Sequence, residues 1–310
     1  VGSEMCIRDR EIIDEYGADS ARIAVLYGGE GMDDANFDRA FAKQLGPKLE
    51  QFYTFSVENY NKGRTDKKQI DEWFISNMNL IVKETTQAME ETMFRTALLK
   101  GFFEMQRILK WYLKRTEPNR EAISNFIEKS LLLLAPFAPF ICEETWEKIG
   151  KKGLISVAQW PEAGEINVSL NKNEEMIEQL LSDVRNVVRL AKIEKPKKTV
   201  ILVSDQWKYD LCKTVREKTA ETRKVSDILA SIMQTGLKKY GQEISKMLPK
   251  MVDKLPDTVL SQNEEFEFLD ESREFLEKEL GLPVEIAKAQ DSKEAKARNA
   301  LPGKPAIIVS

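Results

Sequence analysis

Histidine is absent from this chain of 310 residues. Histidine is the commonest general base and a frequent zinc ligand, so its absence excludes Ser/His and Cys/His nucleophilic pairs. Cysteine is also scarce: Cys6, Cys142 and Cys212 are odd in number and far apart, which predicts neither a disulfide framework nor a zinc knuckle and favours a reducing, cytoplasmic setting. We therefore expect no catalytic residues and no metal ligands in this chain.

Long apolar runs and a strong charge of one sign are missing too. The longest apolar run, 131–141, is interrupted by two prolines and is too short to cross a bilayer, so we expect a buried core and no membrane partner. The 47 Lys and Arg residues against 51 Asp and Glu residues leave a formal net charge of -4. A nucleic-acid partner would therefore have to meet a local basic patch.

Helical periodicity dominates the first half of the chain. Two short helices are expected over 11–27, separated at Gly17, because glycine commonly ends a helix. The next helix, which Asp33 or Asp34 could cap, continues past a kink at Pro47. Asp66 and Gln69 have the spacing of a capping box. Further helices are expected over 65–91, 94–112, 118–134 and 141–150, and short connections between them predict an antiparallel bundle.

The second half alternates short β-rich runs with helices. The runs INVSL, TVILVS, LPVEIAKA and PAIIVS predict strands, and helices are expected over 207–255 and 270–280. The expected fold class is mainly α, an antiparallel helix bundle followed by a smaller mixed α/β C-terminal domain. The expected divisions are junction helices over 11–34, the bundle over 35–164 and the C-terminal domain over 165–310.

Three clusters of basic residues are candidate RNA contacts. We call them the lysine turn, the basic ridge and the basic tail. The lysine turn comprises Arg189, Lys192, Lys195, Lys197 and Lys198, with Trp207 and Lys208 following the next strand. The basic ridge comprises Arg107, Lys110, Lys114 and Arg115, and the basic tail comprises Lys296, Arg298 and Lys304. Several cations can contact neighbouring phosphates, and Trp207 could stack on a base. The alternative for each cluster is a solvated helix end or face.

Several segments together resemble one enzyme family. EIIDEYGADSARIAVLYGGEGMDDANF resembles the segment that follows the KMSKS signature of class I aminoacyl-tRNA synthetases, and LLLLAPFAPFICEETWEKIG with SVAQWP resembles the end of their helical anticodon-binding domain. KPKKTVILVSDQWKYDLC and KARNALPGKPAIIV are similar to the C-terminal extension of leucyl-tRNA synthetases of the archaeal and eukaryotic-cytosolic type, with the archaeal type favoured.

The resemblance implies a tRNA-binding C-terminal part of an enzyme that attaches leucine to tRNA(Leu). It implies ATP and Mg²⁺ as cofactors of the full-length enzyme and none for this part, which lacks the HIGH, KMSKS and editing regions and is not expected to aminoacylate alone. The implied partners are tRNA(Leu), whose long variable arm the C-terminal domain approaches, and the catalytic domain of the same chain. We expect a cytoplasmic monomer.

Other interpretations remain open at this stage. The chain could derive from an isoleucyl, valyl or methionyl enzyme of the same subclass, or could be a non-catalytic helical interaction module. The basic clusters beside Trp207 favour RNA binding over a pure scaffold. Residues 1–10, VGSEMCIRDR, resemble translated adapter sequence and are expected to be foreign to the gene product.

Overall fold

The fold was derived from a computed structural model, in which the chain divides into two compact units, Val1–Val168 and Ser169–Ser310. The structure describes residues 9–31, 36–167, 169–191, 196–219, 224–253, 260–292 and 294–310. Four features of the sequence analysis lie outside these ranges: the first eight residues of the suggested foreign segment 1–10, the candidate caps Asp33 and Asp34, and Lys192 and Lys195.

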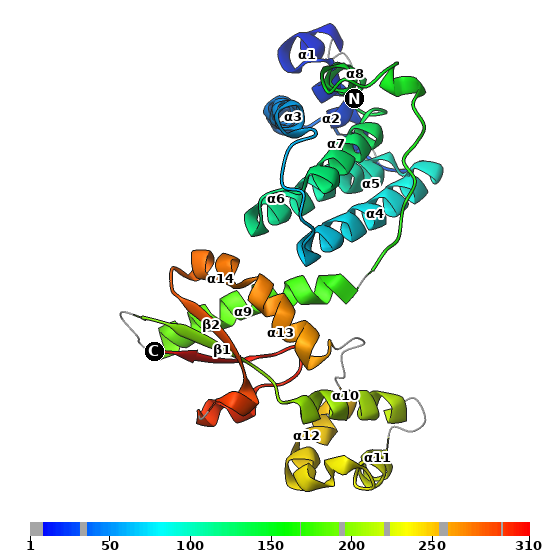
Figure 1. The fold of residues 1–310 in the computed structure, drawn as a ribbon. Helices are drawn as coiled ribbons and strands as arrows, with labels where there is room; N and C mark the ends of the chain where they lie inside the picture. Colours follow the sequence, from blue (N-terminus) through cyan, green and yellow to red (C-terminus); the bar gives the residue numbers. More distant parts are fainter. Residues whose placement is uncertain are drawn as a thin grey trace. The chain divides into compact units, whose positions relative to one another are not determined.

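The first unit is a helix bundle, as predicted (Figure 1). Its helices are α1 (Asp9–Tyr16), α2 (Ala18–Tyr27), α3 (Arg39–Asn59), α4 (Gln69–Glu90), α5 (Phe94–Leu98), the π-helix η2 (Leu99–Glu104), α6 (Met105–Arg115), α7 (Arg120–Leu134), α8 (Pro139–Lys148) and the 3-10 helix η3 (Ile155–Val157). Gly17 separates α1 from α2 at a φ of 81°, a conformation that glycine adopts without steric cost. Pro47 lies inside α3, so the predicted helix does continue past it.

Aromatic packing defines the centre of the bundle, where α4, α6 and α7 meet. Phe74 of α4 stacks on Tyr112 of α6, with ring centroids 4.2 Å apart, and on Phe126 of α7. All three side chains are fully buried. The α6 residues that face this core recur every three or four positions, so its remaining positions face solvent.

Helix starts in this unit differ from two sequence predictions. Asp66 does not form a capping box with Gln69; Asp71, one turn inside α4, instead accepts a hydrogen bond from the Lys68 backbone N–H at 2.8 Å. Helix α7 begins at Arg120 rather than at Pro118, because the Asn119 side chain accepts the backbone N–H groups of the first turn.

The second unit contains a three-stranded mixed sheet in the order β2-β1-β3. The strands are β1 (Thr199–Val203), β2 (Val284–Lys288) and β3 (Ala306–Val309). Strand β1 is central, parallel to β2 and antiparallel to β3. These are three of the four predicted strands; the INVSL prediction was wrong, because Ser169 and Leu170 begin helix α9. Ordinary amphipathic packing explains this, since Ile177, Leu180 and Val184 continue a buried helical stripe.

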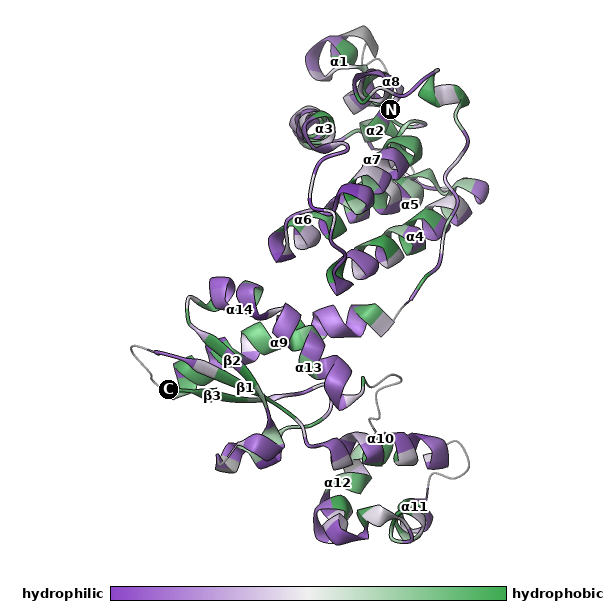
Figure 2. Ribbon diagram, in the orientation of Figure 1, coloured by the Kyte–Doolittle hydropathy of each residue, from purple (hydrophilic) through white to green (hydrophobic). Residues whose placement is uncertain are grey.

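Two helical groups accompany the sheet. Helix α9 (Ser169–Leu190) packs against β3, while α13 (Gln262–Glu271) and α14 (Arg273–Leu280) pack against β2. Between β1 and β2 the chain also forms α10 (Gln206–Thr219), α11 (Val225–Ile232), η4 (Gly236–Tyr240) and α12 (Gly241–Asp253), and the segment before β3 contains η5 (Ala289–Asp291) and η6 (Ala295–Asn299). Helices α10 to α12 enclose an apolar cluster of their own, which includes Trp207, Ile228 and Ile244. Figure 2 shows hydrophobic colouring along the strands and polar colouring on the outer helical surfaces.

Candidate nucleic-acid interface

The basic ridge lies on the side of α6 that points away from the bundle core. Arg107, Lys110 and Lys114 are exposed, and Arg115 is half-buried at the helix end. Part of this charge is paired within the helix, since Arg107 bonds Glu104 at 2.6 Å. The Lys114 ammonium lies 5.8 Å from the centre of the Trp111 ring. The ridge therefore presents three adjacent cations and a partly exposed aromatic ring to solvent.

A buried polar network holds the end of the bundle where this ridge ends. The Tyr112 hydroxyl donates to Asp71 Oδ1 at 2.6 Å and accepts the Asn119 backbone N–H at 2.8 Å. Asp71 also pairs with the Arg64 guanidinium. Burial, followed by the hydrogen bond to Asp71, raises the pKa of Tyr112, so its hydroxyl remains protonated. The network joins the loops that follow α3 and α6, and no sequence motif had indicated it.

The described part of the lysine turn lies at the start of β1. Arg189 is exposed near the end of α9 and donates to Asn186 Oδ1 at 3.0 Å. The Lys197 and Lys198 side chains are exposed, while their backbone N–H groups both donate to the Ser310 carbonyl oxygen. Lys198 also pairs with Glu285 of β2. The backbone of this turn is thus tied to the last residue of the chain.

Trp207 and Lys208 occupy a different environment from the exposed RNA contacts that the sequence predicted. Trp207 is 8% exposed, and its ring stacks on Tyr240 at 4.3 Å. Lys208 is 3% exposed, and its ammonium donates to the carbonyl oxygens of Arg298 and Ala300 at 2.7 and 2.6 Å. Burial lowers the pKa of Lys208. Because its ammonium is held in the interior, Lys208 is a structural residue, and its predicted contact with RNA is not available here.

The basic tail surrounds a tight turn of the backbone. Lys296, Arg298 and Lys304 are all exposed. The Leu301 and Lys304 backbones exchange hydrogen bonds of 3.0 and 2.8 Å, and Gly303 between them has a φ of 73°. A positive φ suits glycine, which has no Cβ to clash with the backbone. The tail is therefore an ordered turn that carries three cations.

Buried side chains from α10 and α13 hold this turn against the sheet. Glu265 of α13 is 1% exposed and accepts the Gly303 backbone N–H at 2.8 Å, and burial raises the pKa of this carboxyl. Ser204 donates to the Ala300 carbonyl oxygen at 3.0 Å, and Gln262 donates to the Ser204 carbonyl oxygen at 2.6 Å. With Lys208, these contacts fix the backbone on which the basic tail is displayed.

The strand β1 separates two of the predicted clusters. Lys197 and Lys198 precede this strand, whereas Ser204 and Lys208 follow it. The five residues of β1 extend about 17 Å at the usual rise of a strand. The fold therefore brings the basic tail to Lys208 and leaves the lysine turn at the opposite end of β1.

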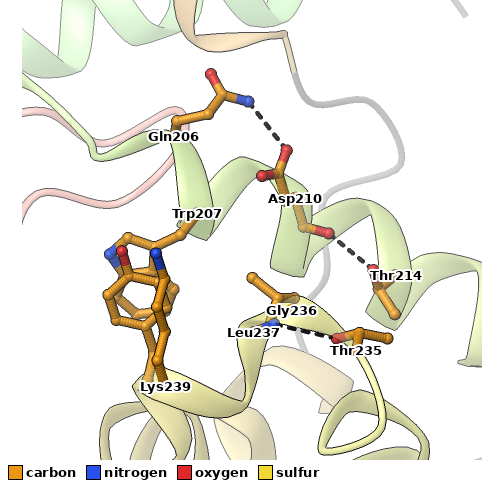
Figure 3. Close-up of a pocket in the computed structure, with 9 residues that line it drawn as sticks. Gln206, Trp207, Asp210, Thr214, Thr235, Gly236, Leu237 and Lys239 are labelled. Carbon is orange, nitrogen blue, oxygen red and sulfur yellow. Dashed lines mark hydrogen bonds between the residues drawn. The ribbon is translucent and has the colours of Figure 1, made fainter.

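A pocket of about 520 Å³ lies between α10 and the η4 helix (Figure 3). Its lining residues are Gln206, Trp207, Asp210, Thr214, Thr235, Gly236, Leu237, Lys239 and Tyr240. Asp210 Oδ1 accepts the Gln206 amide at 3.0 Å, and the Lys239 ammonium lies 4.9 Å from the centre of the Tyr240 ring. The pocket thus combines stacked aromatic rings, a cation and a carboxylate, and of these residues the sequence had singled out only Trp207.

Among the described residues, none of the helices combines the length and the apolar character that a membrane span requires. Over the same residues, no group of three or more His, Cys, Asp or Glu side chains could hold a metal ion.

Comparison with known proteins shows what this chain is similar to. Residues 71–202 match the anticodon-binding domain of tRNA ligase. Leucine-tRNA ligases of Pyrococcus horikoshii, Aeropyrum pernix and Methanocaldococcus jannaschii are 34%, 33% and 32% identical to this chain, each over 96% of its length. Over nearly its whole length, the chain is therefore similar to one part of archaeal leucine-tRNA ligases. It matches the C-terminal part of these relatives and spans 31–32% of their length.

The leucyl-tRNA ligase match includes both units of the chain. The anticodon-binding match runs from α4 into β1 and so contains the basic ridge, and the leucyl relatives align beyond it, over nearly the whole chain. Among solved structures, a ternary complex of a LeuRS of Agrobacterium radiobacter K84 with tRNA and LeuAMS is similar at a TM-score of 0.44 and 20% identity, covering 52% of this chain and 21% of that one.

Proposed function

We propose that this chain is the tRNA-binding C-terminal part of a cytoplasmic leucyl-tRNA ligase, which attaches leucine to tRNA(Leu) with ATP and Mg²⁺. The observation that carries the proposal is the alignment of 96% of the chain with archaeal leucine-tRNA ligases. In this proposal the partners are tRNA(Leu) and the catalytic domain of the same enzyme, the working form is a monomer, and the described residues supply binding rather than catalysis.

The proposed RNA contacts are the cations of the ridge, turn and tail. They are Arg107, Lys110, Lys114, Arg115, Arg189, Lys192, Lys195, Lys197, Lys198, Lys296, Arg298 and Lys304. All of the described members except the half-buried Arg115 are exposed, which supports this choice because phosphate contact requires the ammonium or guanidinium group to reach solvent. Trp207 remains a candidate RNA contact because its ring lines the pocket. Lys208 is no longer a candidate because it is buried.

Titration of the whole chain with labelled tRNA(Leu) at two salt concentrations tests this function. We expect binding at low salt that weakens as salt rises, since each phosphate contact releases condensed counterions. Undetectable binding at low salt, or an affinity that does not change with salt concentration, would contradict the proposal.

The lysine turn provides a finer test of which tRNA is recognised. Replacing Lys195, Lys197 and Lys198 together by Ala should weaken binding of a tRNA with a long variable arm more than that of a tRNA with a short one. Equal losses for the two tRNAs would mean that the turn supplies only nonspecific attraction. Replacing Lys83, Lys148 and Lys152, which are exposed on the first unit and outside the clusters, removes the same charge and serves as control.

A further inference from the structure

The pocket between α10 and η4 carries chemistry that a phosphate-binding surface does not need. Arg and Lys side chains suffice to bind an RNA backbone, yet a carboxylate and two stacked aromatic rings line this pocket. A carboxylate repels phosphate, but it accepts hydrogen bonds from the N–H groups of a base. We propose that this pocket binds an unpaired guanine base of an RNA strand, an inference that rests on the proposed RNA-binding function.

Stacking supplies the first part of the site. Trp207 and Tyr240 stack with their ring planes at 13° and their centroids 4.3 Å apart. The Lys239 ammonium also lies over the Tyr240 ring, 4.9 Å from its centre. An exposed cation–π contact is weaker than the stacking of a base on an aromatic ring, so a base can replace the lysine and extend the column.

Lys239 then becomes available for the phosphate of the same nucleotide. Its side chain is exposed, as is that of the neighbouring Lys238. A displaced ammonium needs only rotations of the lysine side chain to reach a phosphate at the pocket rim. Stacking and phosphate contact are the two elements that commonly hold single-stranded nucleic acid.

Asp210 supplies the choice of base. Its Oδ1 accepts the Gln206 amide, and among the described residues Oδ2 has no hydrogen-bond or ion-pair partner. In Figure 3 the carboxylate of Asp210 stands over the pocket from α10, above Gly236 and Leu237. Guanine presents two adjacent donors, the ring N1–H and the exocyclic amine, on its Watson–Crick edge. A carboxylate can accept both, whereas adenine, cytosine and uracil offer only one of these donor positions.

The floor of the pocket is rigid enough to position these groups. Trp207 packs in the apolar cluster of α10 to α12 with Leu211 and Leu237. The Thr235 hydroxyl accepts the Leu237 backbone N–H and so fixes the start of η4. The space beside Gly236 is open, since a Cβ at this position would meet nothing within 4 Å. A volume of about 520 Å³ lies in the range of small-ligand sites.

Short fluorescent RNAs made of uridine with one central guanosine, adenosine, cytidine or uridine test the inference on the whole chain. We expect the guanosine RNA to bind about tenfold more tightly than the others, by fluorescence anisotropy. Asp210→Asn should abolish this preference, because an amide cannot accept both donors. Asp227→Asn removes the same charge from exposed α11, outside the pocket, and should retain the preference.

Tyr240 provides a second pair of variants. Tyr240→Leu should weaken all four RNAs together, whereas Tyr240→Phe keeps the ring and should retain both affinity and preference. Circular dichroism of each variant checks that the helices remain folded. Equal affinity for the four RNAs, or a guanosine preference that survives in Asp210→Asn, would overturn the inference.

A parallel titration with tRNA(Leu) at low salt separates the two proposals. If tRNA(Leu) binds but the short RNAs show no base preference, the guanine site is wrong and the proposed function stands. If neither tRNA(Leu) nor any short RNA binds, both proposals fail.

Discussion

Lys208 carries its ammonium group into the interior of the C-terminal unit, where two carbonyl oxygens receive it. A buried lysine is costly unless its donors are satisfied, because the charge loses its hydration. Here the N–H donors of the Lys208 ammonium bond the carbonyl oxygens of Arg298 and Ala300, in the segment that carries the basic tail. Lys208 therefore does not contact RNA itself, but it holds the backbone of the basic tail, whose cations we propose to contact RNA.

Lys208→Met tests this role. The change leaves the Arg298 carbonyl oxygen without its side-chain donor and removes one of the two side-chain donors to the Ala300 carbonyl oxygen, which Ser204 still serves. We expect a loss of about 2 kcal/mol in the free energy of unfolding. Urea denaturation followed by circular dichroism measures it. Lys213→Met, at an exposed position of the same helix, should cost little. Equal stability of the two variants would show that the carbonyl contacts do not stabilise the turn.

Helix α6 joins the core of the first unit to its basic surface. Tyr112 faces inward and Lys114 outward, so one element supplies both stability and charge. The π-helix η2 precedes it, where Gly101 allows close approach to Thr85 and Leu133. The sequence predicted one helix over 94–112, and its apolar period does not distinguish a π-turn, which tertiary contacts favour here.

Tyr112→Phe tests how strongly the polar network holds the loops at the end of α6. The change removes the donor to Asp71 and the acceptor for the Asn119 N–H in a fully buried site. We expect a loss of about 1–3 kcal/mol in the free energy of unfolding, measured by urea denaturation. Tyr53→Phe, on half-buried Tyr53 of α3, is the matched control. A stability equal to that of the control variant would contradict the role of the network.

Each of the two units carries its own basic surface, and binding data can weigh them separately. The slope of log K against log salt for tRNA(Leu) is expected to be negative. If each cation contacts one phosphate, changing Lys296, Arg298 and Lys304 together to Ala should reduce the magnitude of this slope by roughly three. Replacing Arg107, Lys110 and Lys114 measures the ridge in the same way. A slope unchanged by either set would exclude that surface from phosphate contact.

Much of the architecture follows from the sequence because it depends on local periodicity. Stripes at spacings of three and four give the bundle helices, and β-branched runs give β1, β2 and β3. INVSL shows the limit of this reasoning: a short β-rich run at a helix start is ambiguous until neighbouring turns are packed. The exposed cations of the basic ridge also follow from periodicity, since they lie opposite the apolar stripe of α6.

The sequence by itself determined that this chain has a helical bundle, a mixed second unit, no histidine chemistry and local basic clusters. Only the tertiary structure decided that Lys208 is buried, that the basic tail is an ordered turn and that Asp210 lines the same pocket as the stacked rings of Trp207 and Tyr240. The physical reason is that these features depend on contacts between distant segments. Lys208 meets Ala300 across 92 residues, and no local pattern specifies which carbonyl oxygen a lysine will reach after the strands have paired.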